Sequence, residues 1–160
     1  MKNKPTTLKD KLQIAKVILK NSSFSINKDI KAAFLEAALE SGENKTQSYE
    51  GVINIHLLSH KNNINFVYIF EFECGSRVVK TTNDKGEPYD EIGEEQIVYS
   101  VNATFEVSYL SETELTEDEI NKYADKYVIH HVWPYWREYF QNSLSRMEAP
   151  KLQIPLSYGR

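Results

Sequence analysis

Two stretches of strict alternation between apolar and polar residues constrain this chain more than any other feature. In residues 63–79, every second position carries an apolar or aromatic side chain: Ile64, Phe66, Tyr68, Phe70 and Phe72. The same period runs through a later stretch, at Ile97, Tyr99, Val101, Ala103, Phe105, Val107 and Tyr109. A period of two indicates a β-strand with one covered face and one face toward solvent. The sequence therefore predicts two long neighbouring strands that share an apolar face.

Two further strands are predicted upstream. Residues 12–26 read as extended, but the apolar phase changes between Ile14 and Val17, which indicates a bulge near Ala15 and Lys16. Residues 48–59 place Ile53, Ile55 and Leu57 on one face. A hairpin-length turn follows at residues 61–63, and residues 81–93 are typical of an exposed loop. Consecutive alternating strands with short turns predict an antiparallel sheet of four strands.

Helical signals follow the last strand. Thr116 is a good N-cap, with Glu119 three residues later as the partner of a capping box. The helix is expected to continue to about Met147, with a kink at residues 130–134 because Pro134 lacks a backbone donor. A shorter helix is predicted from Asp29, as N-cap, to Leu39, with Gly42 as its stop. The 160 residues then form a single α+β domain, 1–160, with a four-stranded antiparallel sheet packed by one long kinked helix.

The long helix carries an unusually wide apolar arc. At about 100° per residue, the apolar positions of residues 128–140 span roughly 160°. One sheet covers a stripe nearer 100° wide on a surface helix. The surplus predicts a second protein surface, most simply another copy of the chain. The predicted oligomer interface consists of Val128, Ile129, Val132, Trp133, Tyr135, Trp136, Tyr139 and Phe140.

The sequence offers no catalytic or metal-binding constellation. His130 and His131 are adjacent, so on a helix they diverge too far to share one metal ion. The net charge of −4 argues against direct binding of nucleic acid. A single cysteine, Cys74, fits a reducing cytosol, and we expect neither a signal peptide nor a membrane span. These features predict a cytoplasmic binding protein without a cofactor rather than an enzyme.

The end of the helix and the segment after it resemble the SecB family of export chaperones. The family pattern is an aromatic-Pro-Tyr-x-Arg-Glu core, then Ser-Arg, then Pro-x-Leu-x-Leu-x-Pro. In this chain it is matched by Pro134, Tyr135, Arg137, Glu138, Ser145, Arg146, Pro150, Leu152, Ile154 and Pro155. The strand at residues 12–26 resembles the family's first strand, and four strands and a long helix arrive in the family's order. The resemblance covers most of residues 8–156.

This resemblance implies both an assembly and an activity. SecB-like proteins are homotetramers, built as dimers of dimers, with the long helices between two sheets. They hold unfolded polypeptide in apolar grooves without ATP. By the resemblance and the alternation, the residues predicted to bind the client are Ile53, Ile55, Leu57, Leu152, Ile154 and Leu156. Two alternatives stay open. The six residues could instead belong to an ordinary core, and Trp133 and Trp136 could contact either the client or another subunit.

Departures from the family pattern bear on the partner. The acidic positions through which export chaperones dock SecA align with Asn21, Ser25 and Val98, so SecA binding should be weak or absent. The sequence also ends where export chaperones carry a further helix. Solitary SecB-like proteins of this kind often serve an antitoxin within a toxin–antitoxin–chaperone operon. That function is the one we favour, with a general export chaperone and a small-molecule-binding α+β domain as alternatives.

Overall fold

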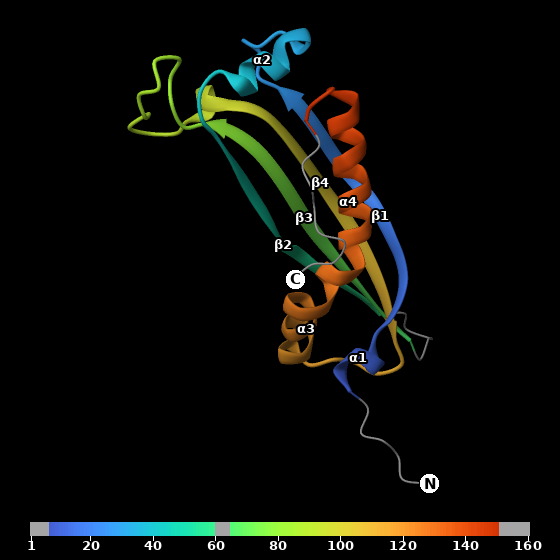
Figure 1. Cartoon of the computed structure of the whole chain (residues 1–160). Helices are drawn as coiled ribbons and strands as arrows, with labels where there is room; N and C mark the ends of the chain where they lie inside the picture. The colour runs from blue at the N-terminus through green and yellow to red at the C-terminus, as the bar shows by residue number, and fades with distance from the viewer. Residues whose placement is uncertain (1–6, 60–64, 151–160) are drawn as a thin grey trace.

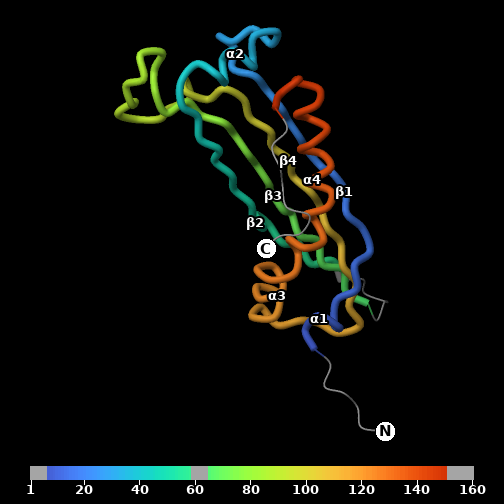
Figure 2. The backbone as a smooth tube through the Cα atoms, in the orientation of Figure 1, coloured from blue at the N-terminus to red at the C-terminus, as the bar shows by residue number. Residues whose placement is uncertain are grey.

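The computed structural model describes residues 7–59 and 65–150 as one curved sheet with helices on one face (Figure 1). A single helical turn, α1 (Leu8–Lys11), precedes the first strand, and a short helix, α2 (Leu35–Glu40), follows it. The strands are β1 (Gln13–Ile26), β2 (Asn44–Ser59), β3 (Phe66–Lys80) and β4 (Ile97–Ser111). Helices α3 (Glu117–Tyr123) and α4 (Ile129–Arg146) complete the chain that is described. Figure 2 shows α2 and α3 at opposite ends of the sheet, with α4 running between them.

The four strands are antiparallel in the order β1-β4-β3-β2, which confirms the predicted sheet. Strands β3 and β4 therefore form the centre, and β1 and β2 form the two edges. The expected turn at residues 61–63 lies outside the described residues. The predicted loop at 81–93 is confirmed, and a bridge between Thr82 and Pro88 ties it together.

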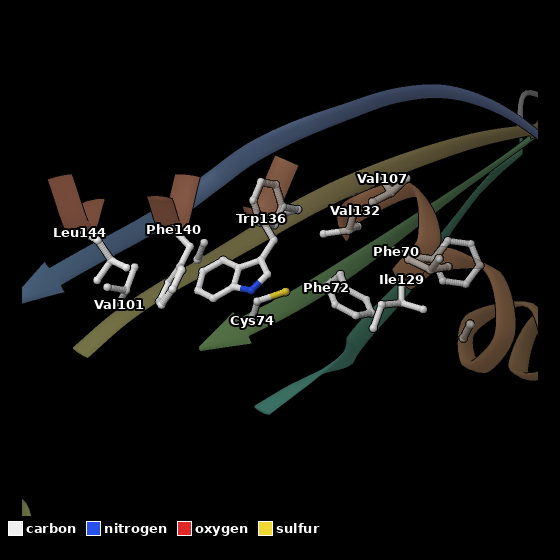
Figure 3. Packing of buried hydrophobic residues seen from close by; sticks show 14 of the residues in the cluster. Phe70, Phe72, Cys74, Val101, Val107, Ile129, Val132, Trp136, Phe140 and Leu144 are labelled. Atoms are coloured by element: carbon white, nitrogen blue, oxygen red, sulfur yellow. The ribbon is translucent and has the colours of Figure 1, made fainter. Parts of the chain in front are cut away.

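The alternation in β3 and β4 sorts the side chains as predicted. Tyr68, Phe70, Phe72 and Cys74 are buried on the helix side, and their β4 neighbours from Ala103 to Tyr109 are buried with them. Helix α4 packs on this layer through Ile129, Val132, Trp136, Phe140 and Leu144, as Figure 3 shows. In the same view the Trp136 indole lies above Cys74. The central strands are thus apolar on the helix side because that face forms the core.

The predicted bulge in β1 is present and explains the change of apolar phase. The register with β4 slips between Ile14 and Lys16, and again between Leu19 and Asn21. Since each slip adds one residue, Ile14, Val17 and Leu19 all lie opposite helix-side residues of β4. The bulges keep these three apolar residues on one face although their sequence spacing is irregular.

The helical region begins as predicted but breaks earlier than expected. The Thr116 side chain accepts a hydrogen bond from the Glu119 N–H at 3.3 Å, and Glu119 Oε2 accepts the Thr116 N–H at 3.1 Å, so the capping box is confirmed. The irregularity is a π-helical segment, Ala124–Val128, that separates α3 from α4. Pro134 lies inside α4, which is helical on both sides of it, and the expected kink at residues 130–134 stays a prediction. A π segment is itself a common cause of a bend, and it precedes the proline by more than one turn.

The helix predicted from Asp29 is shorter than expected. Residues 28–30 form a turn, in which the Asp29 N–H donates to Asn27 Oδ1 at 3.0 Å. Helical structure begins only with a 3-10 turn at Ala32–Phe34, so Asp29 is not the N-cap. Gly42, with a φ of 95°, ends the segment as predicted, because glycine tolerates this left-handed conformation.

Candidate client-binding surface

The predicted client-binding residues of β2 are all at least partly exposed. Ile53 is 57% exposed and Leu57 is 42% exposed, whereas Ile55 is half-buried against the core. Ile55 lies opposite Phe70 and Leu57 lies opposite Tyr68, so both point to the helix side of the sheet. Ile53 is the extra residue of a bulge between Val52 and Asn54. The other three predicted residues, Leu152, Ile154 and Leu156, lie outside the described residues.

Two further exposed apolar residues were not predicted, and both lie apart from the helix-side residues of β2. Leu58 is 55% exposed and lies opposite Val67, on the sheet face away from the helices. Phe34, beside α2, is 62% exposed. A period of two assigns apolar residues to one face of a strand, so it did not predict Leu58 on the other face. An edge strand can expose apolar residues on both faces. The signal that could have found it is the adjacent pair Leu57 and Leu58, which breaks the period of two.

The predicted oligomer interface on the long helix is covered mostly by the chain itself. Five of its eight residues are 6% exposed or less and pack on the chain's own sheet: Val128, Ile129, Val132, Trp136 and Phe140. Their side chains are unavailable to a second subunit in this conformation, because a curved sheet together with the π segment covers more of the helix than a flat contact would. Tyr135 remains 48% exposed, and Trp133 and Tyr139 are half-buried.

A hollow of about 290 Å³ lies between β1 and α4, with Glu138, Asn142 and Arg146 in its lining beside apolar and aromatic residues. Leu19 and Phe24 line it from β1, and Tyr135 and Tyr139 line it from α4. Leu19 and Phe24 are each 43% exposed. The exposed part of the helix arc therefore continues onto the edge strand β1, and together these residues form one apolar surface.

The sheet face away from the helices carries a chain of charges. Lys20 pairs with Glu71 and, at 2.9 Å, with Glu106, and His56 Nε2 lies 3.8 Å from Glu71. Glu71 and Glu106 lie directly opposite one another on β3 and β4, an arrangement that is unfavourable without a cation. The hydrogen bond from Lys20 holds the pKa of Glu71 below its usual range. Lys20 thus connects the edge strand β1 to both central strands, β4 and β3.

Replacing Lys20 with methionine is expected to raise the pKa of Glu71, because its main source of stabilisation as a carboxylate is removed. The folded state of the wild type binds fewer protons than the unfolded state, so this stability is present above the ordinary pKa of about 4.5 and is lost as pH falls through the folded pKa. The stability difference between the two proteins should therefore be largest near neutral pH and shrink in acid. NMR titration and denaturation at two pH values measure both effects. Lys16→Met, in the same strand, should leave the pKa of Glu71 unchanged.

The positions that align with the acidic SecA-docking residues of export chaperones are Asn21, Ser25 and Val98. Asn21 and Ser25 are exposed, but Val98 is only 1% exposed and cannot belong to a docking surface. The predicted place of Val98 on the docking surface is therefore wrong, because its side chain lies in the core. The outer face carries acidic residues elsewhere, at Glu71, Glu73 and Glu106, and Lys20 pairs with the first and the last of these.

The described residues offer little for small-molecule chemistry. They contain no group of three or more potential metal ligands, and none of their helices is long and apolar enough to cross a bilayer. Burial raises the pKa of Tyr99 and Cys74 to about 12, but both lie in the core rather than in a cleft. His131 is hydrogen-bonded to the Tyr109 hydroxyl at 2.8 Å, and burial lowers its pKa. These shifts follow from packing and mark no reactive site.

Comparison with known proteins reveals a likeness of fold. No family model and no curated protein sequence matches the chain. Among solved structures, it is similar to the SecB-like chaperone of Mycobacterium tuberculosis in complex with a ChAD peptide from the HigA1 antitoxin. The TM-score is 0.59 at 18% sequence identity, and the alignment covers 93% of this chain and 92% of the other. With the strand order and the long C-terminal helix in place over nearly the whole length, the chain has the SecB-like fold.

Proposed function

We propose that this protein is a cytoplasmic SecB-like chaperone that holds unfolded or aggregation-prone polypeptide without ATP. The observation that carries the proposal is the exposure of three apolar side chains on the edge strand β2, Ile53, Leu57 and Leu58, in a chain with the SecB-like fold. Apolar burial is non-directional, so such a surface accepts many sequences. This is the property a holding chaperone needs, and it assigns the protein to binding rather than to catalysis.

We propose an antitoxin as the dedicated client. The similar mycobacterial chaperone was solved with a peptide from an antitoxin, which supports this choice. The exposed positions Asn21 and Ser25 carry no acidic charge for SecA, which disfavours general export. Measurement of SecA binding to the purified protein separates the two: tight binding would favour an export chaperone.

We propose assembly as a dimer of dimers through the remaining helix surface. Tyr135 is exposed on α4, Tyr139 lines the hollow beside it, and Leu19 and Phe24 extend this surface onto β1. Exposed aromatic patches of this kind are typical of contacts between subunits. A particle four times the mass of the 18.6 kDa chain is the expected result in light scattering.

An aggregation assay tests the client surface. A chemically denatured protein is diluted into buffer with the chaperone, and light scattering is followed without ATP. The wild type should suppress aggregation, and Leu57→Asp should need about tenfold more protein for the same effect, because burial of one apolar side chain is lost. Ile92→Asp is the matched control, since Ile92 is 39% exposed but lies in the loop after β3, at the opposite end of the sheet from Leu57. Wild-type protein that fails to suppress aggregation would exclude the chaperone function.

A further inference from the structure

The two edge strands of the sheet differ in how well they are protected. Free edges present unpaired N–H and C=O groups, and proteins usually block them with charges, prolines or bulges. Strand β1 carries Lys16 and Lys20 and two bulges. Strand β2 has one bulge, and from Gly51 to Leu58 it contains no proline and no Lys, Arg, Asp or Glu. Beyond the bulge, β2 thus carries no Lys, Arg, Asp or Glu, and within residues 7–59 and 65–150 no strand pairs with its outer edge.

The same part of β2 is apolar on both faces. Leu57 points to the helix side and Leu58 to the opposite side, and both are exposed. One edge donor is satisfied locally, since the Ile55 N–H donates to Asn54 Oδ1 at 2.9 Å. Helix α4 packs over β1, β3 and β4 (Figure 1), and on the helix side β2 contacts the π-helical segment Ala124–Val128. A segment lying along this edge would therefore meet backbone groups in front of it and apolar side chains on both sides.

We propose that the client binds by adding a strand to the β2 edge, between Gly51 and Ser59. Unpaired backbone donors and acceptors in a row are complementary to another extended backbone, and this dictates the chemistry of the occupant. The occupant is an extended client segment with apolar residues at alternate positions and no proline at the positions whose N–H faces β2. The proposal rests on the proposed chaperone function and deepens it, because it makes the client's backbone part of recognition.

Continuity with the predicted client surface supports a client strand over a second copy of the chain. Side chains that a docked strand turns toward the helix side would lie beside Leu57 and Ile55, which are predicted client contacts. The surface proposed for assembly lies at the other edge, on β1 and α4. In this proposal the β1 edge contacts other subunits and the β2 edge binds the client.

Backbone methylation of a model peptide tests the proposal. The probe is a ten-residue synthetic peptide in which valine alternates with lysine and glutamate in turn. One derivative is N-methylated at every valine and another at every charged residue. Because alternate N–H groups of a strand point to opposite sides, one derivative should bind at least about tenfold more weakly while the other binds like the parent. Equal binding of all three peptides, or equal loss in both derivatives, would overturn the proposal.

Amide hydrogen exchange of the ¹⁵N-labelled full chain places the added strand. Saturation with the unmodified peptide should slow exchange at alternate amides of residues 51–59 and leave β1 unchanged. Protection along β1 instead of β2 would overturn the proposal. Protection of alternate β2 amides without peptide would also overturn it, because it would show that a second copy of the chain already pairs with this edge. Suppressed aggregation together with indifference to methylation would leave the chaperone function standing and remove only the strand addition. If the protein neither binds the peptide nor suppresses aggregation, both the chaperone function and the strand addition are excluded.

Discussion

Replacing Trp136 with alanine is expected to lower the free energy of unfolding by about 3–5 kcal/mol. The indole is 4% exposed and packs between α4 and the sheet, above Cys74 (Figure 3). Its ring centre lies 5.3 Å from that of Phe140, so the substitution also removes an aromatic contact. The cavity it leaves lies between two rigid layers that cannot close it. Urea denaturation followed by circular dichroism measures the change.

Tyr135→Ala is the matched control, because the neighbouring residue of the same helix is 48% exposed. It should change the free energy of unfolding by about 1 kcal/mol or less. If Tyr135 lies between subunits as proposed, this variant should instead reduce the particle mass in light scattering. A Trp136→Ala protein as stable as the wild type would contradict the core position of the indole.

Replacing Tyr68 with phenylalanine is expected to cost about 1–3 kcal/mol of stability, although only one oxygen atom is removed. The Tyr68 hydroxyl accepts the Leu115 N–H at 2.8 Å, and both residues are buried. The loss leaves this N–H without a partner away from water, just before the N-cap of α3. The hydrogen bond therefore anchors the start of the helical region to the central strand β3. Thermal and urea denaturation are the measurements.

Tyr109→Phe is the comparison, because Tyr109 lies directly opposite Tyr68 and is equally buried. Its hydroxyl bonds to His131, which is only half-buried. Water can replace the tyrosine at the histidine ring, so the expected cost is about 1 kcal/mol or less. A larger cost for Tyr109→Phe than for Tyr68→Phe would show that the buried backbone group does not decide the outcome.

The features of this protein that depend on neighbours along the chain were predictable from the sequence. The period of two in β3 and β4 requires one apolar face, since side chains of a strand alternate whatever the strand packs on. The phase change between Ile14 and Val17 located a bulge for the same reason. Thr116 and Glu119 fixed the start of α3 because the capping box involves only residues three apart.

Which apolar side chains stay exposed depends on contacts between distant segments, and the sequence did not predict it. The helix arc at residues 128–140 looked too wide for one sheet, yet a curved sheet buries Trp136 and leaves Tyr135 outside. Leu57 and Leu58 are exposed because β2 is an edge strand, and the order of strands depends on contacts between residues far apart in sequence. The same holds for Lys20, which meets Glu71 across an intervening strand. Periodicity reports which face a residue lies on, whereas burial depends on what other segments of the chain cover that face.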